Sequence, residues 1–169
     1  EYIELYNNTN STIDLTDWII TIETTEKVFP TSKIEADSFV LLVKEDALNS
    51  FPSNISKIGF SSISLTNWGA DIVLKDNNGK TINAISYTDK WYNNEDKSEG
   101  GWSIERANPN LYCERQHNWR ASISNIGGNI TPRLVGFSVD PTAATTNGET
   151  YYSIAKTANC PDLTSTAAT

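Results

Sequence analysis

The feature that most constrains the fold is one Asn-Gly step between two alternating runs. Residues 70–75 and 81–87 alternate apolar and polar side chains, and the segment between them contains Asn78 and Gly79. A period of two is the pattern of a half-buried strand. Asn-Gly between two such runs is the strongest short-range signal of a β-hairpin. The sequence therefore predicts an antiparallel hairpin near the middle of the chain.

Short strand-like runs with turn residues between them recur along the first part of the chain. They cover residues 2–6, 13–15, 18–22, 39–43, 102–106 and 119–122. The apolar run 39–43 suits a strand that is buried on both faces. No segment keeps a helical period, and strands spaced about ten residues apart indicate a β-sandwich. We therefore expect an all-β sandwich of short, mostly antiparallel strands.

The segments between these runs carry weaker signals. Residues 44–51 predict one helical turn, which Pro52 ends, and the polar residues 88–101 predict a long surface loop. Trp18 and Trp102 lie in alternating runs and are expected in the core, whereas Trp119 is expected to anchor packing.

Charge and hydropathy bear on several classes of partner. The chain has 169 residues and a net charge of −8, and its basic residues are scattered. Proteins that bind nucleic acid usually carry a basic patch or stripe, so nucleic acid is not an expected partner. No apolar run reaches the roughly 18 residues that span a bilayer, so membrane insertion is not expected. The chain opens directly in a strand-like run without Met, which favours a piece of a longer protein.

Cysteine usage leaves two readings open. Cys113 and Cys160 are the only cysteines. They either form one disulfide, which would favour an oxidising compartment, or remain two unrelated thiols. A structural zinc site needs about four Cys or His ligands in close pairs, and this pattern does not resemble one.

Residues for catalysis or metal binding form no convincing constellation. The one histidine, His117, lies in a polar segment, and no Gly-x-Ser-x-Gly turn occurs. The candidate paired carboxylates are Glu23, Glu26, Glu95, Asp96 and Glu99. Nothing singles out a pair with a raised pKa, so a solvated charge cluster is the preferred interpretation. The nearest approach to a calcium loop is Asp71 with residues 76–79, which the hairpin already explains. We expect no enzyme activity, cofactor or metal.

Three aromatic residues in turns or loops are the candidate binding residues. Trp68, Trp91 and Tyr92 stand among polar neighbours. Exposed aromatic side chains can mark a binding surface. For Trp91 and Tyr92, structural wedging is an equally good interpretation.

The order of motifs resembles the lamin tail domain, an immunoglobulin-like sandwich of nuclear lamins and many secreted bacterial proteins. The resemblance covers residues 1–132 and looks closest to the secreted bacterial branch. It rests on Glu1-Tyr2-Ile3-Glu4-Leu5-Tyr6-Asn7, Asp14-Leu15-Thr16-Asp17-Trp18, Phe39-Val40-Leu41-Leu42, Leu65-Thr66-Asn67, Asp71-Ile72-Val73-Leu74-Lys75-Asp76, Asn78-Gly79, Ile82, Tyr87, Trp91-Tyr92, Gly101-Trp102-Ser103-Ile104-Glu105-Arg106, Asn118-Trp119-Arg120-Ala121-Ser122, Gly127-Gly128 and Pro132.

This chain departs from the family pattern in three places. The family usually has a further strand before the opening motif, which lies upstream here or is replaced by residues 134–139. Trp68 stands where the family commonly has a small polar residue. Residues 133–169 match nothing in the family and are expected to form an extension, a linker or the start of a following segment.

The resemblance implies a non-catalytic interaction or spacer module of a larger secreted or cell-surface protein. Its expected partners are proteins or neighbouring domains of the parent chain. The alternative is a carbohydrate-binding module in which Trp68, Trp91 and Tyr92 form one exposed stacking platform.

Overall fold

The computed structural model describes residues 1–108 and 118–122, which fall into two compact units. The described part of the first unit is residues 1–86, and that of the second is residues 87–108 and 118–122. Cys113, Cys160 and residues 133–169 lie outside the described residues, so the disulfide and the extension stay predictions. The predicted domain boundary at residue 132 likewise stays a prediction.

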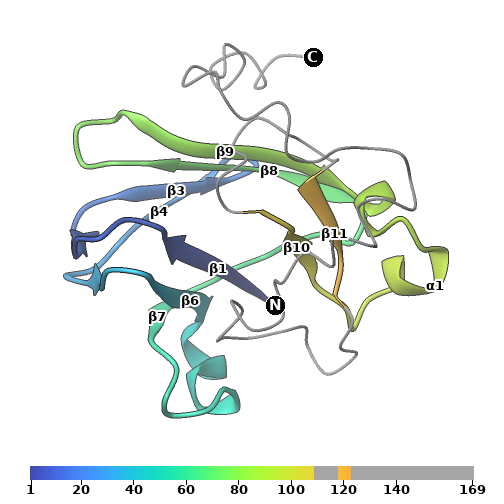
Figure 1. The fold of residues 1–169 in the computed structure, drawn as a ribbon, viewed down its shortest axis with the longest axis horizontal. Helices are drawn as coiled ribbons and strands as arrows, with labels where there is room; N and C mark the ends of the chain where they lie inside the picture. Colours follow the sequence, from blue (N-terminus) through green and yellow to red (C-terminus); the bar gives the residue numbers. More distant parts are fainter. Residues whose placement is uncertain (109–117, 123–169) are drawn as a thin grey trace. The chain divides into compact units, whose positions relative to one another are not determined.

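One sheet of the first unit is built around a fully buried central strand. Strand β6 (Ser38–Lys44) lies between β1 (Tyr2–Asn7), which pairs with it antiparallel, and β7 (Lys57–Phe60), which pairs with it parallel (Figure 1). The four residues Val40 to Val43 are all buried. The prediction of a strand buried on both faces is therefore confirmed for residues 40–43, whereas Phe39 is half-buried.

A helical turn packs against the outer face of this sheet. The 3₁₀ helix η1 (Glu45–Ser50) follows β6 and lies within residues 44–51, for which the sequence predicted one helical turn. A Cβ atom at Gly59 in β7 would lie only 3.0 Å from Leu48 Cδ1, so glycine permits this close approach. Tyr2 of β1 meets Phe51 edge to face, with ring centroids 5.9 Å apart. These contacts cover the second face of β6, the most deeply buried strand of the first unit.

The second sheet contains the predicted hairpin. Its order is β4 (Thr25–Val28), β3 (Ile19–Ile22), β8 (Gly69–Lys75) and β9 (Thr81–Thr88). The pairs β3–β4 and β3–β8 are antiparallel. A two-stranded ribbon of β2 (Ile13–Asp14) and β5 (Lys33–Ile34) completes the strands of this unit.

The hairpin turn uses only one residue of the Asn-Gly pair in the left-handed region. Gly79 has φ +81°, whereas Asn78 is not among the residues with positive φ. Gly79 N–H donates to Asp76 O (3.0 Å), and Asp76 N–H donates to Lys80 O (2.9 Å). This is the longer hairpin connection, in which glycine forms a bulge after the turn. Asp76 Oδ1 also accepts from the N–H groups of Asn78 and Lys80, each at 2.9 Å.

The core lies between the two sheets of the first unit. The Phe29 and Phe60 rings meet edge to face with centroids 5.3 Å apart, which links the segment after β4 to β7. Both rings are buried, together with Ile20 and Ile72 of the second sheet. Antiparallel strands in two packed sheets confirm the predicted all-β sandwich.

Trp18 lies outside the core that its sequence pattern predicted. The segment Leu15 to Trp18 makes a turn in which Trp18 N–H donates to Leu15 O (3.0 Å) and Asp17 has φ +62°. The turn interrupts the alternation, so Leu15 takes the buried position and Trp18 is only half-buried. The expectation that Trp18 is a core residue was therefore wrong.

The described part of the second unit contains two helical segments that the sequence did not predict. Residues 88–101 were expected to be a loop, yet they contain η2 (Asp89–Tyr92) and α1 (Glu95–Ser98). Asn94 caps α1, because its Oδ1 accepts from Lys97 N–H (3.1 Å). The other elements are the antiparallel strands β10 (Ile104–Arg106) and β11 (Trp119–Ala121). Segments of four residues are too short to show a helical period.

Candidate interaction surface

Trp68 is presented at the tip of a hydrogen-bonded turn in the first unit. Gly69 N–H donates to Thr66 O (3.3 Å), and the Thr66 hydroxyl donates to Gly69 O. Gly69 has φ +142°, which favours glycine at this position. The Trp68 side chain is 77% exposed, the largest value among the exposed large apolar residues of the described chain. The fold therefore does not bury this indole, which remains available for contact.

The aromatic residues of the second unit are occupied by contacts within that unit. Trp91 is only 8% exposed, and its ring centroid lies 5.7 Å from that of Trp119. Arg106 lies over the Trp119 ring at 4.9 Å. The expectation that Trp119 anchors packing agrees with these contacts. Cation–π and aromatic contacts of this kind stabilise the described part of the second unit.

Tyr92 and Trp102 belong to a second cluster in the same unit. The Tyr92 hydroxyl donates to Trp102 O (3.1 Å), and Lys97 Nζ lies 4.1 Å from the Trp102 ring centroid. Lys97 Nζ also donates to Ser122 O (2.7 Å). Trp102, which was expected in the core, is only half-buried, because it lies under a lysine side chain rather than between sheets.

The predicted platform of three exposed aromatic rings is not what the structure presents. Trp91 is buried against Trp119, so its faces are not available to stack on a sugar ring. Tyr92 is half-buried and hydrogen-bonded. Structural wedging, the other interpretation of this pair, agrees with their contacts. Trp68 is the residue of the three that retains a large exposed surface.

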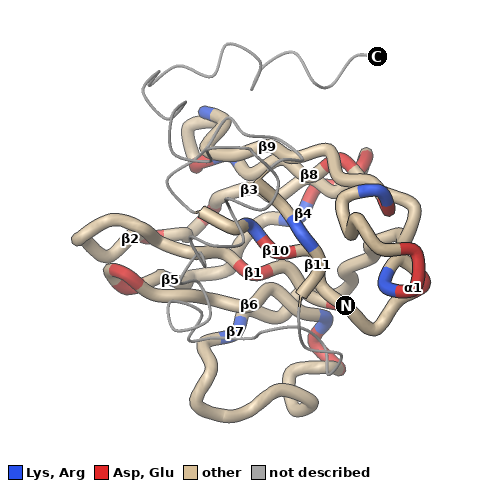
Figure 2. Tube along the Cα trace, turned by 45° about the vertical axis from the view of Figure 1, so that its right-hand side comes forward, with Lys and Arg blue, Asp and Glu red and all other residues tan. Residues whose placement is uncertain are grey.

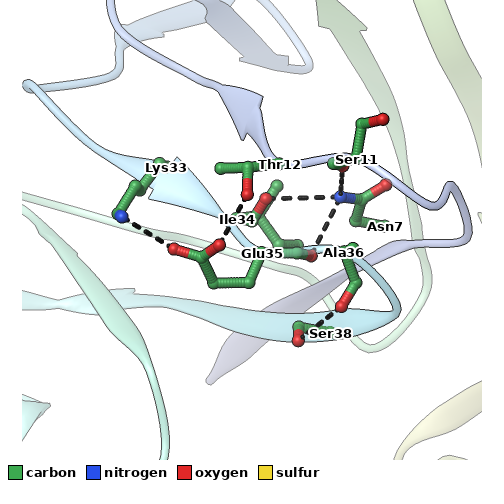
Figure 3. A network of polar contacts seen from close by, with 8 residues as sticks. All are labelled: Asn7, Ser11, Thr12, Lys33, Ile34, Glu35, Ala36 and Ser38. Atoms are coloured by element: carbon green, nitrogen blue, oxygen red, sulfur yellow. Dashed lines mark hydrogen bonds and ion pairs between the residues drawn. The ribbon is translucent and has the colours of Figure 1, made fainter.

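A buried asparagine fastens the loop that follows β1. Asn7 is 3% exposed, and its Nδ2 donates to the carbonyl oxygens of Ser11 (2.8 Å), Ile34 (3.2 Å) and Glu35 (2.9 Å) (Figure 3). Its Oδ1 accepts from Thr9 N–H (3.0 Å) and from the Thr9 hydroxyl (2.8 Å). Both ends of the amide are therefore used. This site is structural.

A charged group borders the Asn7 network. Glu35 accepts hydrogen bonds from Lys33 and from the Thr12 hydroxyl, and these contacts lower the pKa of the Glu35 carboxyl (Figure 3). The hydrogen bond from Lys33 is the largest cause, and the same contact raises the pKa of Lys33.

We expect the Glu35 contacts to stabilise the fold at neutral pH and to weaken in acid. A carboxyl whose pKa is depressed on folding contributes stability above its unfolded pKa, and that contribution is lost as the pH falls through its folded pKa. The melting temperature of Glu35→Gln should therefore lie slightly below that of the wild type at pH 7, and the gap should close as the pH falls below the ordinary carboxyl range. A gap that stays constant from pH 7 to strongly acidic pH would contradict the assignment.

The described residues offer no assembled site for catalysis or metal binding. No group of three or more His, Cys, Asp or Glu in the described part could hold a metal ion, and His117 lies outside it. Asp14, Lys33, Glu35 and Lys44 have shifted pKa values, and all four side chains are exposed. Lys and Arg are interspersed with Asp and Glu over the described trace (Figure 2). No helix of the described residues is long and apolar enough to cross a membrane.

These features define an immunoglobulin-like β-sandwich with an exposed tryptophan turn and no assembled reaction centre among its described residues. A family model described as Lamin Tail Domain matches residues 1–89, which is more than half of the chain. The chain therefore belongs to the lamin tail domain family, a non-catalytic immunoglobulin-like family, as its motifs predicted. None of the curated proteins matches the chain.

Proposed function

We propose that this domain is a non-catalytic interaction or spacer module of a larger secreted or cell-surface protein. It contacts a protein partner or a neighbouring domain of the parent chain through the Trp68 turn. The observation that carries the proposal is the 77% exposure of Trp68 on a turn that its own hydrogen bonds hold in place. A large aromatic side chain on a rigid turn gives contact area at a small cost in conformational entropy.

Family membership and surface composition support the same proposal. Lamin tail domains are immunoglobulin-like, and such sandwiches commonly serve in protein contacts. The secreted setting and the link to bacterial relatives belong to the proposal and rest on the motif resemblance. Carbohydrate binding through three stacked rings is disfavoured, because Trp91 is buried. A glycan contact through Trp68 alone is one outcome of the test.

Acrylamide quenching of tryptophan fluorescence tests whether Trp68 is available in solution. We expect Trp68→Phe to remove the most quenchable component of the emission, whereas Trp91→Phe should leave that component in place. The titration is then repeated with a panel of neutral and acidic glycans. Protection of the quenchable component by a glycan would favour carbohydrate binding, and a Trp68 that is already shielded in the isolated chain would contradict the proposal.

A further inference from the structure

Glu23 and Asp71 lie close to the Trp68 turn along the backbone, and neither carboxylate has a basic partner within the described chain. Glu23 N–H donates to Asp71 O (2.8 Å), and Asp71 N–H donates to Glu23 Oε1 (2.7 Å). This reciprocal pair ties the β3–β4 turn to the start of β8, three residues after Trp68. The ion pairs of the described residues are Lys33–Glu35 and Lys44–Asp46. Neither involves Glu23 or Asp71, so both carboxylates remain without a counter-charge there.

An exposed indole and two carboxylates without a counter-charge attract the same kind of ligand. A Lys or Arg side chain within about 6 Å of an indole centroid is attracted by the ring face, and nearby carboxylates strengthen that attraction. The second unit already uses this contact twice, with Lys97 over Trp102 and Arg106 over Trp119. In the described part of the chain no cation–π contact involves Trp68, so the ring face has no cation of its own.

We propose that Trp68, Glu23 and Asp71 form a docking site for an Arg- or Lys-bearing segment of a protein partner. This inference rests on the proposed function and specifies the chemistry of the partner. The net charge of −8 adds long-range attraction for a basic segment and speeds its approach. The hydrogen bond from Asp71 N–H holds the Glu23 carboxylate in place before the partner arrives, which lowers the entropy cost of binding.

Other ligands fit this arrangement less well. Calcium takes six to eight oxygen ligands, and the described residues contain no cluster of three or more candidate metal ligands. A neutral sugar can stack on an indole but gains nothing from the charge of the two carboxylates. A basic side chain uses both parts of the site, since its cation faces the ring while its donors reach carboxylate oxygens.

Fluorescence anisotropy of a labelled peptide tests the inference on the full chain. The probe is an octapeptide of alternating Arg and Ser, and its counterparts carry Gln or Glu in place of Arg. We expect saturable binding of the Arg peptide, weaker at high salt because exposed charges are screened. Trp68→Ala should weaken binding about 2- to 5-fold, and Glu23→Gln with Asp71→Asn should weaken it by a similar factor and reduce the salt dependence.

A charge-matched control separates the site from general attraction. Glu95→Gln with Asp96→Asn removes the same number of charges from exposed positions in the second unit, and it should leave the affinity almost unchanged. Equal weakening by both double variants would overturn the site, as would equal affinity of wild type and Trp68→Ala. The site would also be overturned if calcium displaced the Arg peptide while the Gln peptide did not. If acrylamide quenches Trp68 but the chain binds the Arg and Gln peptides equally well, this inference alone is refuted. If Trp68 is shielded from acrylamide, the proposed function is refuted as well.

Discussion

We expect the Phe29→Ala variant to lose about 3–5 kcal/mol of its free energy of unfolding, the largest effect of a single core substitution in this domain. Phe29 is 1% exposed and packs edge to face on Phe60. Alanine would remove the ring from the space between the two sheets and leave a cavity that the paired strands can close only in part. The contact joins the segment after β4 to β7, so its loss weakens the connection between the sheets.

Urea denaturation followed by far-ultraviolet circular dichroism measures this effect. The neighbouring residue supplies the control, because Val28 is 59% exposed and Val28→Ala should change the free energy of unfolding very little. A loss below about 1 kcal/mol for Phe29→Ala would mean that the two sheets do not share the core described above.

The second large effect is expected at Asn7. Asn7→Ala should lower the free energy of unfolding by about 2–4 kcal/mol, because several buried or partly buried backbone groups lose their partner together. The Asn7 amide serves carbonyl oxygens of the loop after β1 and of the β5 segment, and it accepts from Thr9.

Two further variants make the Asn7 prediction specific. Asn7→Asp keeps the acceptor toward Thr9 but turns a carboxylate oxygen toward carbonyl oxygens. At neutral pH it should therefore lower the free energy of unfolding at least as much as Asn7→Ala does. Asn10→Ala, in the same loop, should have a small effect, because Asn10 is exposed and only accepts from the Ser11 hydroxyl at 3.3 Å. Similar losses for Asn7→Ala and Asn10→Ala in urea denaturation would contradict the role of Asn7.

The parts of the fold that the sequence predicted are those in which pattern and burial agree over several residues. The hairpin of β8 and β9 and the buried strand β6 follow directly from period two and from a continuous apolar run. Trp18 shows where such patterns fail. A turn with Asp17 at φ +62° interrupts the alternation, and Leu15 rather than Trp18 becomes the buried residue. Local backbone geometry therefore decides which of two apolar residues enters the core.

The candidate site was predictable only in part, since exposure depends on contacts between distant residues. Trp68 and Trp91 both stand among polar neighbours in the sequence, yet Trp68 is exposed and Trp91 is buried against Trp119. No local pattern distinguishes them, because the difference comes from a residue 28 positions further along the chain. The departure of Trp68 from the family pattern was the useful signal. The link between Glu23 and Asp71 depends on strand pairing and was not visible in the sequence.

Site-specific photocrosslinking from position 68 tests the proposed interaction surface most directly. A benzophenone amino acid replaces Trp68 in the parent protein, and the control places it at Ile82, which is also exposed. We expect position 68 to crosslink to one discrete protein partner or neighbouring domain, and competition with the Arg peptide should reduce that product. If crosslinking from position 68 is no stronger or more selective than from position 82, the Trp68 turn is not the contact surface of this domain.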